Sequence, residues 1–224
     1  TPRRREDERF VTGAAVYLDD REFPGTAHAV MLRSPHAHAL IAGLNRDAAR
    51  AAAGVLAVLT ATDVALAGLQ PLRPTAEANV KTGAPFAFAT QPLLAVDKVR
   101  YVGEPVALVV AQTREQALDA ADMIEVAYKP LPSVSSTAAA RDPDAPQVAA
   151  EAPGNLCFDW RAGDHAATDA AFAHAAHIVT IDVDNHRIVI NPMEPRGIVA
   201  AYDSELDRYT AHVSSQNVHG IRDL

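Results

Sequence analysis

Apolar residues in the first half of the chain fall into short runs that are separated by polar or proline-containing turns. Strands are predicted at residues 27–32, 39–44, 55–59 and 106–111, and the last of these is an unbroken apolar run typical of a buried strand. A helix is predicted over 46–53, with Asn45 as its N-cap and Gly54 as its stop. This order indicates a βαβ-like alternation.

The most definite local pattern follows residue 111. Thr113 and Gln116 have the spacing of a capping box, so a helix is predicted to begin there. We expect its apolar face to comprise Ala117, Leu118, Ala121 and Ile124. From Ile124 the apolar period changes to two, which predicts a strand that ends at Pro130.

Two proline-rich stretches interrupt this order. Residues 70–91 are predicted to be a long loop, and 133–153 has the composition of a linker. We therefore expect one domain over 1–132, a linker over 133–153, and the first part of a second, incomplete domain over 154–224.

The second block begins with a helix near 169–176, followed by a predicted strand over 178–190. Residues 197–202 and 209–214 are predicted to form an antiparallel hairpin, after which Ser214 or Ser215 would cap a new helix. The apolar stripe of that helix is unfinished at Leu224. We therefore expect the chain to be an N-terminal piece of something larger, or one half of a split subunit.

Composition narrows the functional classes. Hydrophobic residues make up 49% and charged residues 21%, which is typical of a packed globular protein, and the net charge is −8. This charge argues against a nucleic-acid or anionic-membrane binder. The single cysteine, Cys157, excludes an internal disulfide, a cysteine-based zinc site and a cysteine-ligated iron–sulfur cluster within these residues. With no signal peptide and no apolar run of about 20 residues, we expect a soluble cytoplasmic protein without membrane insertion.

Several polar groups are candidates for chemistry. Asp182, Asp184 and His186 would share one face of a strand and could hold a divalent cation. The preferred interpretation is the solvent-facing side of an amphipathic strand, or an interface, because strand alternation alone predicts polar residues there. Ser34 lies near His36 and His38, but no nucleophile elbow surrounds it, so we interpret these histidines as turn or surface residues. We expect no catalytic residue and no metal ligand among them.

Two loops are harder to dismiss. Glu194 and Arg196 lie in a stretch stiffened by two prolines, between predicted strands, where they could pair with each other or face a ligand. Gln216 lies where a strand ends and a helix begins, a common place for ligands in α/β proteins.

Several segments resemble a known family in the same order along the chain. They read RSPHAH at 33–38, VRYVGEPVA at 99–107, YKPLP at 128–132 and PMEPR at 192–196. Together they resemble the large, molybdenum-binding subunit of the xanthine dehydrogenase/aldehyde oxidase family, most closely its carbon monoxide dehydrogenase-like bacterial members. The resemblance implies an α/β (α+β) fold, in which a hammerhead domain is followed by the start of the first molybdopterin-binding domain.

The resemblance also implies an activity and its cofactors. The family hydroxylates an aldehyde or N-heterocycle with water as the oxygen donor. The cofactor implied is molybdopterin cytosine dinucleotide, completed by residues outside this chain. Electrons would pass through [2Fe–2S] clusters on a small subunit to FAD on a medium subunit. A non-catalytic hammerhead binding or assembly module is the alternative.

Residue by residue, the stretch at 214–217 resembles the family's strand-end glutamine, so Gln216 is expected to donate its amide to the apical oxo ligand of molybdenum. Glu194 and Arg196 are expected to support this site from behind. The family's glycine-rich loop and terminal glutamate base match nothing up to residue 224. Alone, the 224 residues are therefore expected to be inactive and to bind no molybdenum cofactor.

Overall fold

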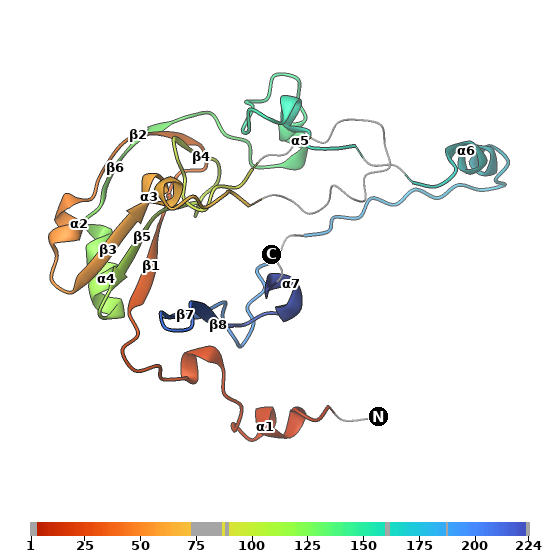
Figure 1. Ribbon diagram of the computed structural model, residues 1–224. Helices are drawn as coiled ribbons and strands as arrows, with labels where there is room; N and C mark the ends of the chain where they lie inside the picture. Colours follow the sequence, from red (N-terminus) through yellow and green to blue (C-terminus); the bar gives the residue numbers. More distant parts are fainter. Residues whose placement is uncertain (1–3, 73–86, 88–89, 160–161, 187, 223–224) are drawn as a thin grey trace. The chain divides into compact units, whose positions relative to one another are not determined.

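We describe the protein from a computed structural model, which places residues 4–72, 87, 90–159, 162–186 and 188–222. The chain forms two compact units, residues 26–176 and residues 1–25 together with 177–224 (Figure 1). Most of the predicted loop at 70–91 lies outside the described residues, apart from a bridge between Leu72 and Gln91.

The unit formed by residues 26–176 contains two three-stranded antiparallel sheets. The first has the order β1 (His28–Arg33), β5 (Pro105–Ala111), β3 (Val55–Thr60). The second has the order β4 (Lys98–Val99), β2 (Ala39–Asn45), β6 (Glu125–Pro130). As its unbroken apolar sequence predicts, β5 is the central strand of its sheet, with buried side chains on both faces.

The strands that flank each helix do not form βαβ units. β2 and β3 surround α2 (Asp47–Ala51) but belong to different sheets, and the same holds for β5 and β6 around α4 (Arg114–Asp122). The predicted βαβ-like alternation is therefore wrong, although the strands and helices themselves are confirmed. The order of elements along a chain does not determine which strands pair, and here each helix connects two sheets instead of two parallel neighbours.

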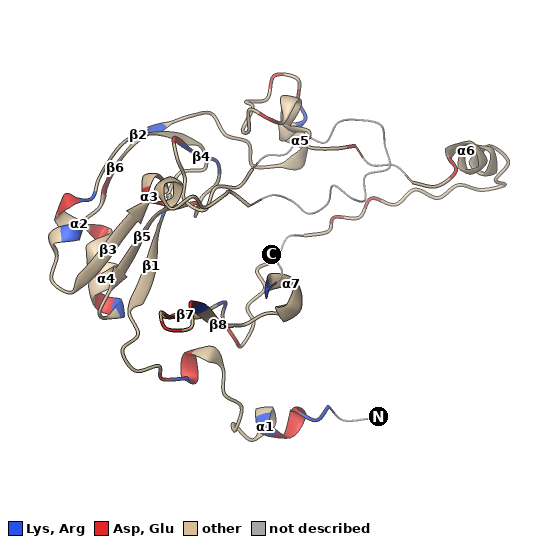
Figure 2. Ribbon diagram, in the orientation of Figure 1, with Lys and Arg blue, Asp and Glu red and all other residues tan. Residues whose placement is uncertain are grey.

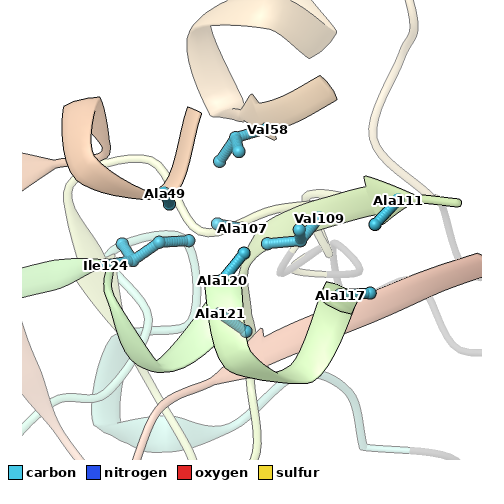
Figure 3. Packing of buried hydrophobic residues seen from close by; sticks show 9 residues of the cluster. All are labelled: Ala49, Val58, Ala107, Val109, Ala111, Ala117, Ala120, Ala121 and Ile124. Carbon is cyan, nitrogen blue, oxygen red and sulfur yellow. The ribbon is translucent and has the colours of Figure 1, made fainter. Parts of the chain in front are cut away.

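Small side chains let α4 pack closely on the first sheet. Ala117, Ala120 and Ala121 of the helix are buried against β5, whereas Leu118 is 42% exposed and does not extend the apolar face as predicted. Figure 3 shows the nine buried side chains of this core, which are Ala49, Val58, Ala107, Val109, Ala111, Ala117, Ala120, Ala121 and Ile124. Because most of them are alanine, the backbones approach closely and leave little room for larger residues.

The N-terminus of α4 has the predicted capping box. The Gln116 backbone N–H donates to the Thr113 hydroxyl at 3.2 Å, and the Thr113 N–H donates to Gln116 Oε1 at 3.1 Å. The Gln116 side chain lies directly over Gly54, where a Cβ atom would be 2.3 Å from its amide group. Gly54 has φ +79°, so both its left-handed backbone and this contact favour glycine after α2.

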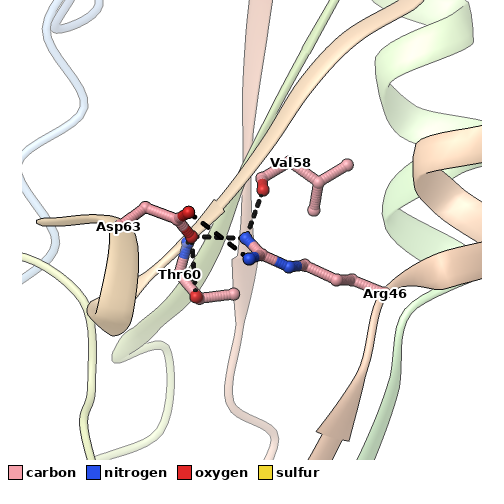
Figure 4. A network of polar contacts seen from close by, with 4 residues as sticks. All are labelled: Arg46, Val58, Thr60 and Asp63. Carbon is pink, nitrogen blue, oxygen red and sulfur yellow. Dashed lines mark hydrogen bonds and ion pairs between the residues drawn. The ribbon is translucent and has the colours of Figure 1, made fainter. Parts of the chain in front are cut away.

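The helix α3 (Ala61–Leu66), which the hydrophobic pattern does not predict, is joined to α2 by a polar network (Figure 4). Arg46, which precedes α2, donates to the Val58 carbonyl at 2.5 Å and forms an ion pair with Asp63. The Asp63 carboxylate also accepts from the Thr60 N–H at 2.7 Å and the Thr60 hydroxyl at 2.8 Å. The hydrogen bond from Arg46 holds the pKa of Asp63 far below its usual range.

The proline-rich segment 133–153 is organised around Asn155. The helix α5 (Thr137–Ala140) lies within it, and the turn η3 (Pro153–Asn155) follows. The Asn155 side chain accepts from the Val148 N–H at 2.9 Å and donates to the carbonyls of Ala140 and Pro146. Beyond this turn, α6 (His165–Ala173) begins earlier than predicted because Asp164 caps it, accepting from the Ala167 N–H.

The unit formed by 1–25 and 177–224 contains short elements. They are α1 (Asp7–Val11), η1 (Leu18–Asp20), β7 (Ile198–Asp203), β8 (Arg208–Val213) and α7 (Val218–Arg222). The predicted hairpin is confirmed, since β7 and β8 pair antiparallel from Ile198–Val213 to Asp203–Arg208. Acidic side chains are concentrated at its turn, which Figure 2 shows in red.

The predicted strand at 178–190 is wrong. In the described part of this segment, 178–186 and 188–190, no residue belongs to a strand. Its large apolar side chains are exposed, for example Val179, Val183 and Val189. Alternation of apolar and polar residues shows which faces a strand would have, but a strand also needs a neighbour for its backbone hydrogen bonds, and the pattern does not supply one.

Candidate cofactor-binding site

The β7–β8 hairpin brings the two candidate loops to the same end of a ribbon. The loop at 191–197 leads directly into β7, and 214–217 follows β8 directly. The first residue of β7, Ile198, pairs with the last residue of β8, Val213. One side-chain hydrogen bond, from the Ser214 hydroxyl to the Pro195 carbonyl at 3.4 Å, also joins the two loops.

Gln216 lies at a bend between two fixed turns, and its side chain is exposed. On one side, the Asn217 N–H donates to the Ser215 hydroxyl at 3.1 Å. On the other, Asn217 Oδ1 accepts from the Gly220 N–H at 3.0 Å, so Asn217 caps α7 and the prediction of Ser214 or Ser215 as the cap is wrong. No residue in the described part of the chain hydrogen-bonds the Gln216 amide, so it is available to a ligand.

Glu194 and Arg196 are placed differently from each other. Glu194 is half-buried, and its Oε1 accepts from the Leu18 N–H at 3.3 Å. Arg196 is exposed and pairs with no acidic group among the residues that the structure places. The two side chains therefore do not form the ion pair that their spacing suggests as one option.

The side chains of Gln216, Glu194 and Arg196 suit an electron-rich ligand. The Gln216 amide and the Arg196 guanidinium are both donors, while the Glu194 carboxylate is engaged by a backbone N–H. A neutral amide stabilises an oxygen that gains negative charge without itself titrating. The donor set at this end of the hairpin therefore fits an oxygen-rich cofactor better than a bare cation.

The structure does not support the alternative metal site. Asp184 Oδ2 and His186 Nδ1 are 3.6 Å apart, but both side chains are well exposed. Within the described ranges, no group of three His, Cys, Asp or Glu side chains could hold a metal ion. Likewise, none of the helices that the structure describes is long and apolar enough to cross a bilayer.

The contacts of Ser34, His36 and His38 have a structural role, not a catalytic one. The Ser34 hydroxyl bonds the backbone N–H and carbonyl of His36, instead of a histidine ring. His38 lies in a bend, as one of the two predicted alternatives has it, but it is only 6% exposed and its Nδ1 lies 2.6 Å from the Pro132 carbonyl, so it is not a surface residue. The His36 ring contacts Tyr128, and burial raises the pKa of that phenol.

Glu104 is a buried acidic side chain that the hydrophobic pattern does not predict. It is 2% exposed, and its carboxylate accepts from the Arg100 N–H at 2.5 Å and lies 3.7 Å from the Arg100 guanidinium. The Ser34 N–H also donates to its carbonyl at 2.9 Å. Glu104 thereby joins the segment at 99–107 to the segment at 33–38. Its only sequence signal is its place between Gly103 and Pro105.

Comparisons with known proteins show the family to which the chain belongs. Residues 12–132 match the family described as aldehyde oxidase and xanthine dehydrogenase, a/b hammerhead domain, and residues 148–224 match the molybdopterin cofactor-binding domain. The carbon monoxide dehydrogenase large chain of Hydrogenophaga pseudoflava is 36% identical over 97% of this chain and 27% of its own length. The nicotine 6-hydroxylase large subunit of Paenarthrobacter nicotinovorans is 38% identical over 98% of this chain and 26% of its own length.

Solved structures extend the comparison. A reconstituted CO dehydrogenase from Oligotropha carboxidovorans superposes with a TM-score of 0.83 at 33% identity, covering 99% of this chain and 28% of that one. Quinoline 2-oxidoreductase from Pseudomonas putida 86 gives a TM-score of 0.77 at 34% identity, covering 95% and 26%. The chain thus spans about a quarter of the length of these relatives. From its sequence, its sheets and these likenesses, the chain belongs to the xanthine dehydrogenase/aldehyde oxidase family of molybdenum-dependent oxidoreductases.

Proposed function

We propose that this chain contributes one wall of the molybdenum site in a hydroxylase that oxidises an aldehyde or N-heterocycle, with water as the oxygen donor. The observation that carries the proposal is the exposed Gln216 amide at the end of β8, next to the loop that holds Glu194 and Arg196. When bound, the cofactor would supply the oxidation of the substrate C–H bond. The relatives named carbon monoxide dehydrogenase and nicotine 6-hydroxylase support this reaction class.

In this proposal the Gln216 amide would help to hold the molybdenum cofactor by donating a hydrogen bond to one of its oxygen atoms. The turns at Ser215 and Asn217 restrict the backbone on both sides of Gln216, so the backbone that carries the amide is in place before the cofactor binds. Arg196 adds a positive charge at the same end of the hairpin and favours an anionic group there. Both residues bind and orient, and neither takes up a proton in the reaction.

We propose the remaining parts of the assembly from what the resemblance to the family implies. The cofactor would be molybdopterin cytosine dinucleotide, completed by the rest of the molybdenum subunit. Electrons would leave through [2Fe–2S] clusters on a small subunit to FAD on a medium subunit, in the cytoplasm. The domains would be a hammerhead domain over 1–132, a linker over 133–153 and the beginning of the molybdopterin-binding domain over 154–224.

Purification of the native complex, followed by native mass spectrometry and metal analysis, tests this assembly. The proposal predicts that the chain co-purifies with iron–sulfur and flavin subunits and with stoichiometric molybdenum. A chain that purifies without these subunits and without molybdenum contradicts it and favours the non-catalytic hammerhead module.

The role of Gln216 is tested separately by Gln216→Ala in the complete enzyme. We expect a lower kcat and an altered Mo(V) EPR spectrum with unchanged subunit assembly, because one donor to the cofactor is lost. Gln112→Ala, which removes an exposed amide from the other unit, is the matched control and is expected to change neither. An unaltered spectrum and kcat in Gln216→Ala would remove Gln216 from the site.

A further inference from the structure

The N-terminal turn belongs physically to the unit that carries Gln216. Residues 1–25 form one compact unit with 177–224, although the hammerhead family match begins at residue 12. We call residues 1–25 the N-terminal arm. Within this arm, η1 (Leu18–Asp20) forms a turn that two hydrogen bonds close. The Tyr17 N–H donates to Asp20 Oδ2 at 2.8 Å, and the Arg21 N–H donates to the Leu18 carbonyl at 3.2 Å. Residues 17–21 therefore form a hydrogen-bonded turn within the arm.

Leu18 joins this turn to the loop before β7 in two ways. Its backbone N–H donates to Glu194 Oε1 at 3.3 Å, in a partly buried place. Its side chain also lies against Gly197, where a Cβ atom would be only 2.9 Å from Leu18 Cδ2. Further along the arm, the Phe23 ring contacts the His212 ring of β8 with centroids 5.0 Å apart. The arm thus contacts the loop before β7 and the strand β8.

The Glu194 loop is in turn connected to Gln216. Pro195, the next residue, accepts a hydrogen bond from Ser214, which is two residues before Gln216. The pairing of Ile198 with Val213 fixes the register of the same two loops. A displacement of Glu194 would therefore reach Gln216 by a short path, through the Pro195 carbonyl, the Ser214 hydroxyl and the paired ends of the two strands.

We propose that Glu194 is a positioning residue whose partner is the N-terminal turn, and that the turn, Glu194 and Ser214 together set the place of the Gln216 amide. The proposal rests on the role of Gln216 in the proposed function. It makes residues 17–21 a structural part of the cofactor site, and it assigns the Glu194 carboxylate to the Leu18 N–H instead of to the cofactor.

Four substitutions, two at Leu18 and two at Glu194, separate the hydrogen bond from other effects, and all are made in the complete holoenzyme. Leu18→Pro removes the N–H donor, and the site tolerates proline because Leu18 is the first residue of the turn and Tyr17 is extended at ψ 173°. Leu18→Ala keeps the donor and removes the side chain. Glu194→Gln keeps an acceptor oxygen, whereas Glu194→Ala does not. Glu205→Ala, an exposed carboxylate at the hairpin turn, is the control.

We expect Leu18→Pro and Glu194→Ala to speed amide hydrogen exchange at 214–217 about fivefold, as for the loss of one hydrogen bond. Both should alter the Mo(V) EPR spectrum and lower kcat several-fold, and the double variant should resemble Leu18→Pro because that substitution already removes the bond to Glu194. Glu194→Gln should lie closer to the wild type than Glu194→Ala does in exchange and spectrum, and Glu205→Ala should match the wild type in exchange, spectrum and kcat. Leu18→Ala, which keeps the donor, should alter the spectrum less than Leu18→Pro.

The inference is overturned if Glu194→Gln is as damaging as Glu194→Ala while Leu18→Pro has no effect, because the charge of Glu194 would then act on the cofactor directly. It is also overturned if Gln216→Ala alters the spectrum and neither Leu18→Pro nor Glu194→Ala does. An unaltered spectrum in Gln216→Ala itself contradicts the proposed function instead, so the two failures are distinguishable.

Discussion

The network around Asp63 offers a sharp test of the forces that join α2, β3 and α3. Its carboxylate accepts four hydrogen bonds, two from Arg46 and two from Thr60. Asp63→Asn preserves the shape of the side chain but replaces one acceptor oxygen by an amide nitrogen and removes the charge. The Arg46 guanidinium then keeps its bond to the Val58 carbonyl but loses its anionic partner.

The magnitude follows from the exposure of the pair. The Arg46 and Asp63 side chains are 22% and 29% exposed, so the pair is shielded from water more than a surface ion pair, whose contribution is about 0–1 kcal/mol. Hydrogen bonds to charged groups contribute about 1.5–3 kcal/mol each when buried. Because part of the network survives in the variant, we expect Asp63→Asn to destabilise this region by about 2 kcal/mol, which is roughly a thirtyfold change in a local opening equilibrium.

The pH dependence has a definite sign. The pKa of Asp63 is lowered in the folded protein, mainly by Arg46, so the unfolded chain binds its proton first as the pH falls. The stabilisation is thus fully present above the unfolded pKa of about 4 and is lost progressively as the pH drops below it toward the folded pKa. The difference between wild type and Asp63→Asn should therefore be large near neutrality and shrink in acid.

Amide hydrogen exchange over 58–67, corrected for intrinsic rates, measures this directly in the intact protein. We expect exchange about thirtyfold faster in Asp63→Asn than in wild type at about pH 7, with a smaller ratio at about pH 3. Asp119→Asn, an exposed carboxylate on α4, is the control and should leave exchange over 58–67 unchanged. Equal exchange in wild type and Asp63→Asn near neutrality would refute the reasoning, as would a ratio that grows in acid.

Three further substitutions test the packing of the same unit by thermal unfolding. Gly54→Ala should destabilise by about 1–3 kcal/mol, because φ is +79° and the new Cβ meets Gln116; a neutral result would contradict the close contact. Ala120→Leu should cost about 1–3 kcal/mol through overpacking between α4 and the sheet, whereas Ala48→Leu at an exposed position of α2 should cost little. Asn155→Ala should destabilise the protein by about 2–4 kcal/mol, because it removes three side-chain hydrogen bonds at a residue with φ +57°. Asn155→Gly removes the same bonds but keeps this backbone conformation accessible, so a glycine variant as stable as the wild type would argue against the hydrogen bonds.

Elements whose causes are local could be predicted from the sequence. The apolar run of β5, the capping box of Thr113 and Gln116, and the β7–β8 hairpin each depend on residues that lie close together along the chain. Pairing between distant strands does not depend on neighbouring residues, and for this reason the predictions of a βαβ-like alternation and of a strand at 178–190 were wrong. Buried polar residues were also missed, since His38 and Glu104 look like surface residues until their carbonyl and backbone partners are in place.

For the candidate site, the hairpin made the nearness of the two loops predictable, because paired strands bring their outer ends together. The exposure of Gln216 agrees with its expected role, and the role itself stays a prediction. The contact between Leu18 and Glu194 had no signal in the sequence, because it joins residues 176 positions apart. The resemblance to the family pointed to the Glu194 loop but not to the N-terminal turn beside it.

An experimental structure of the complete, cofactor-loaded enzyme tests the central claim most directly, through the distance from Gln216 Nε2 to the nearest oxygen ligand of molybdenum. The account predicts a hydrogen bond of about 2.7–3.2 Å, with the amide at the end of β8 directed at the metal. A Gln216 side chain that contacts only protein, or lies more than about 6 Å from any molybdenum ligand, would contradict it.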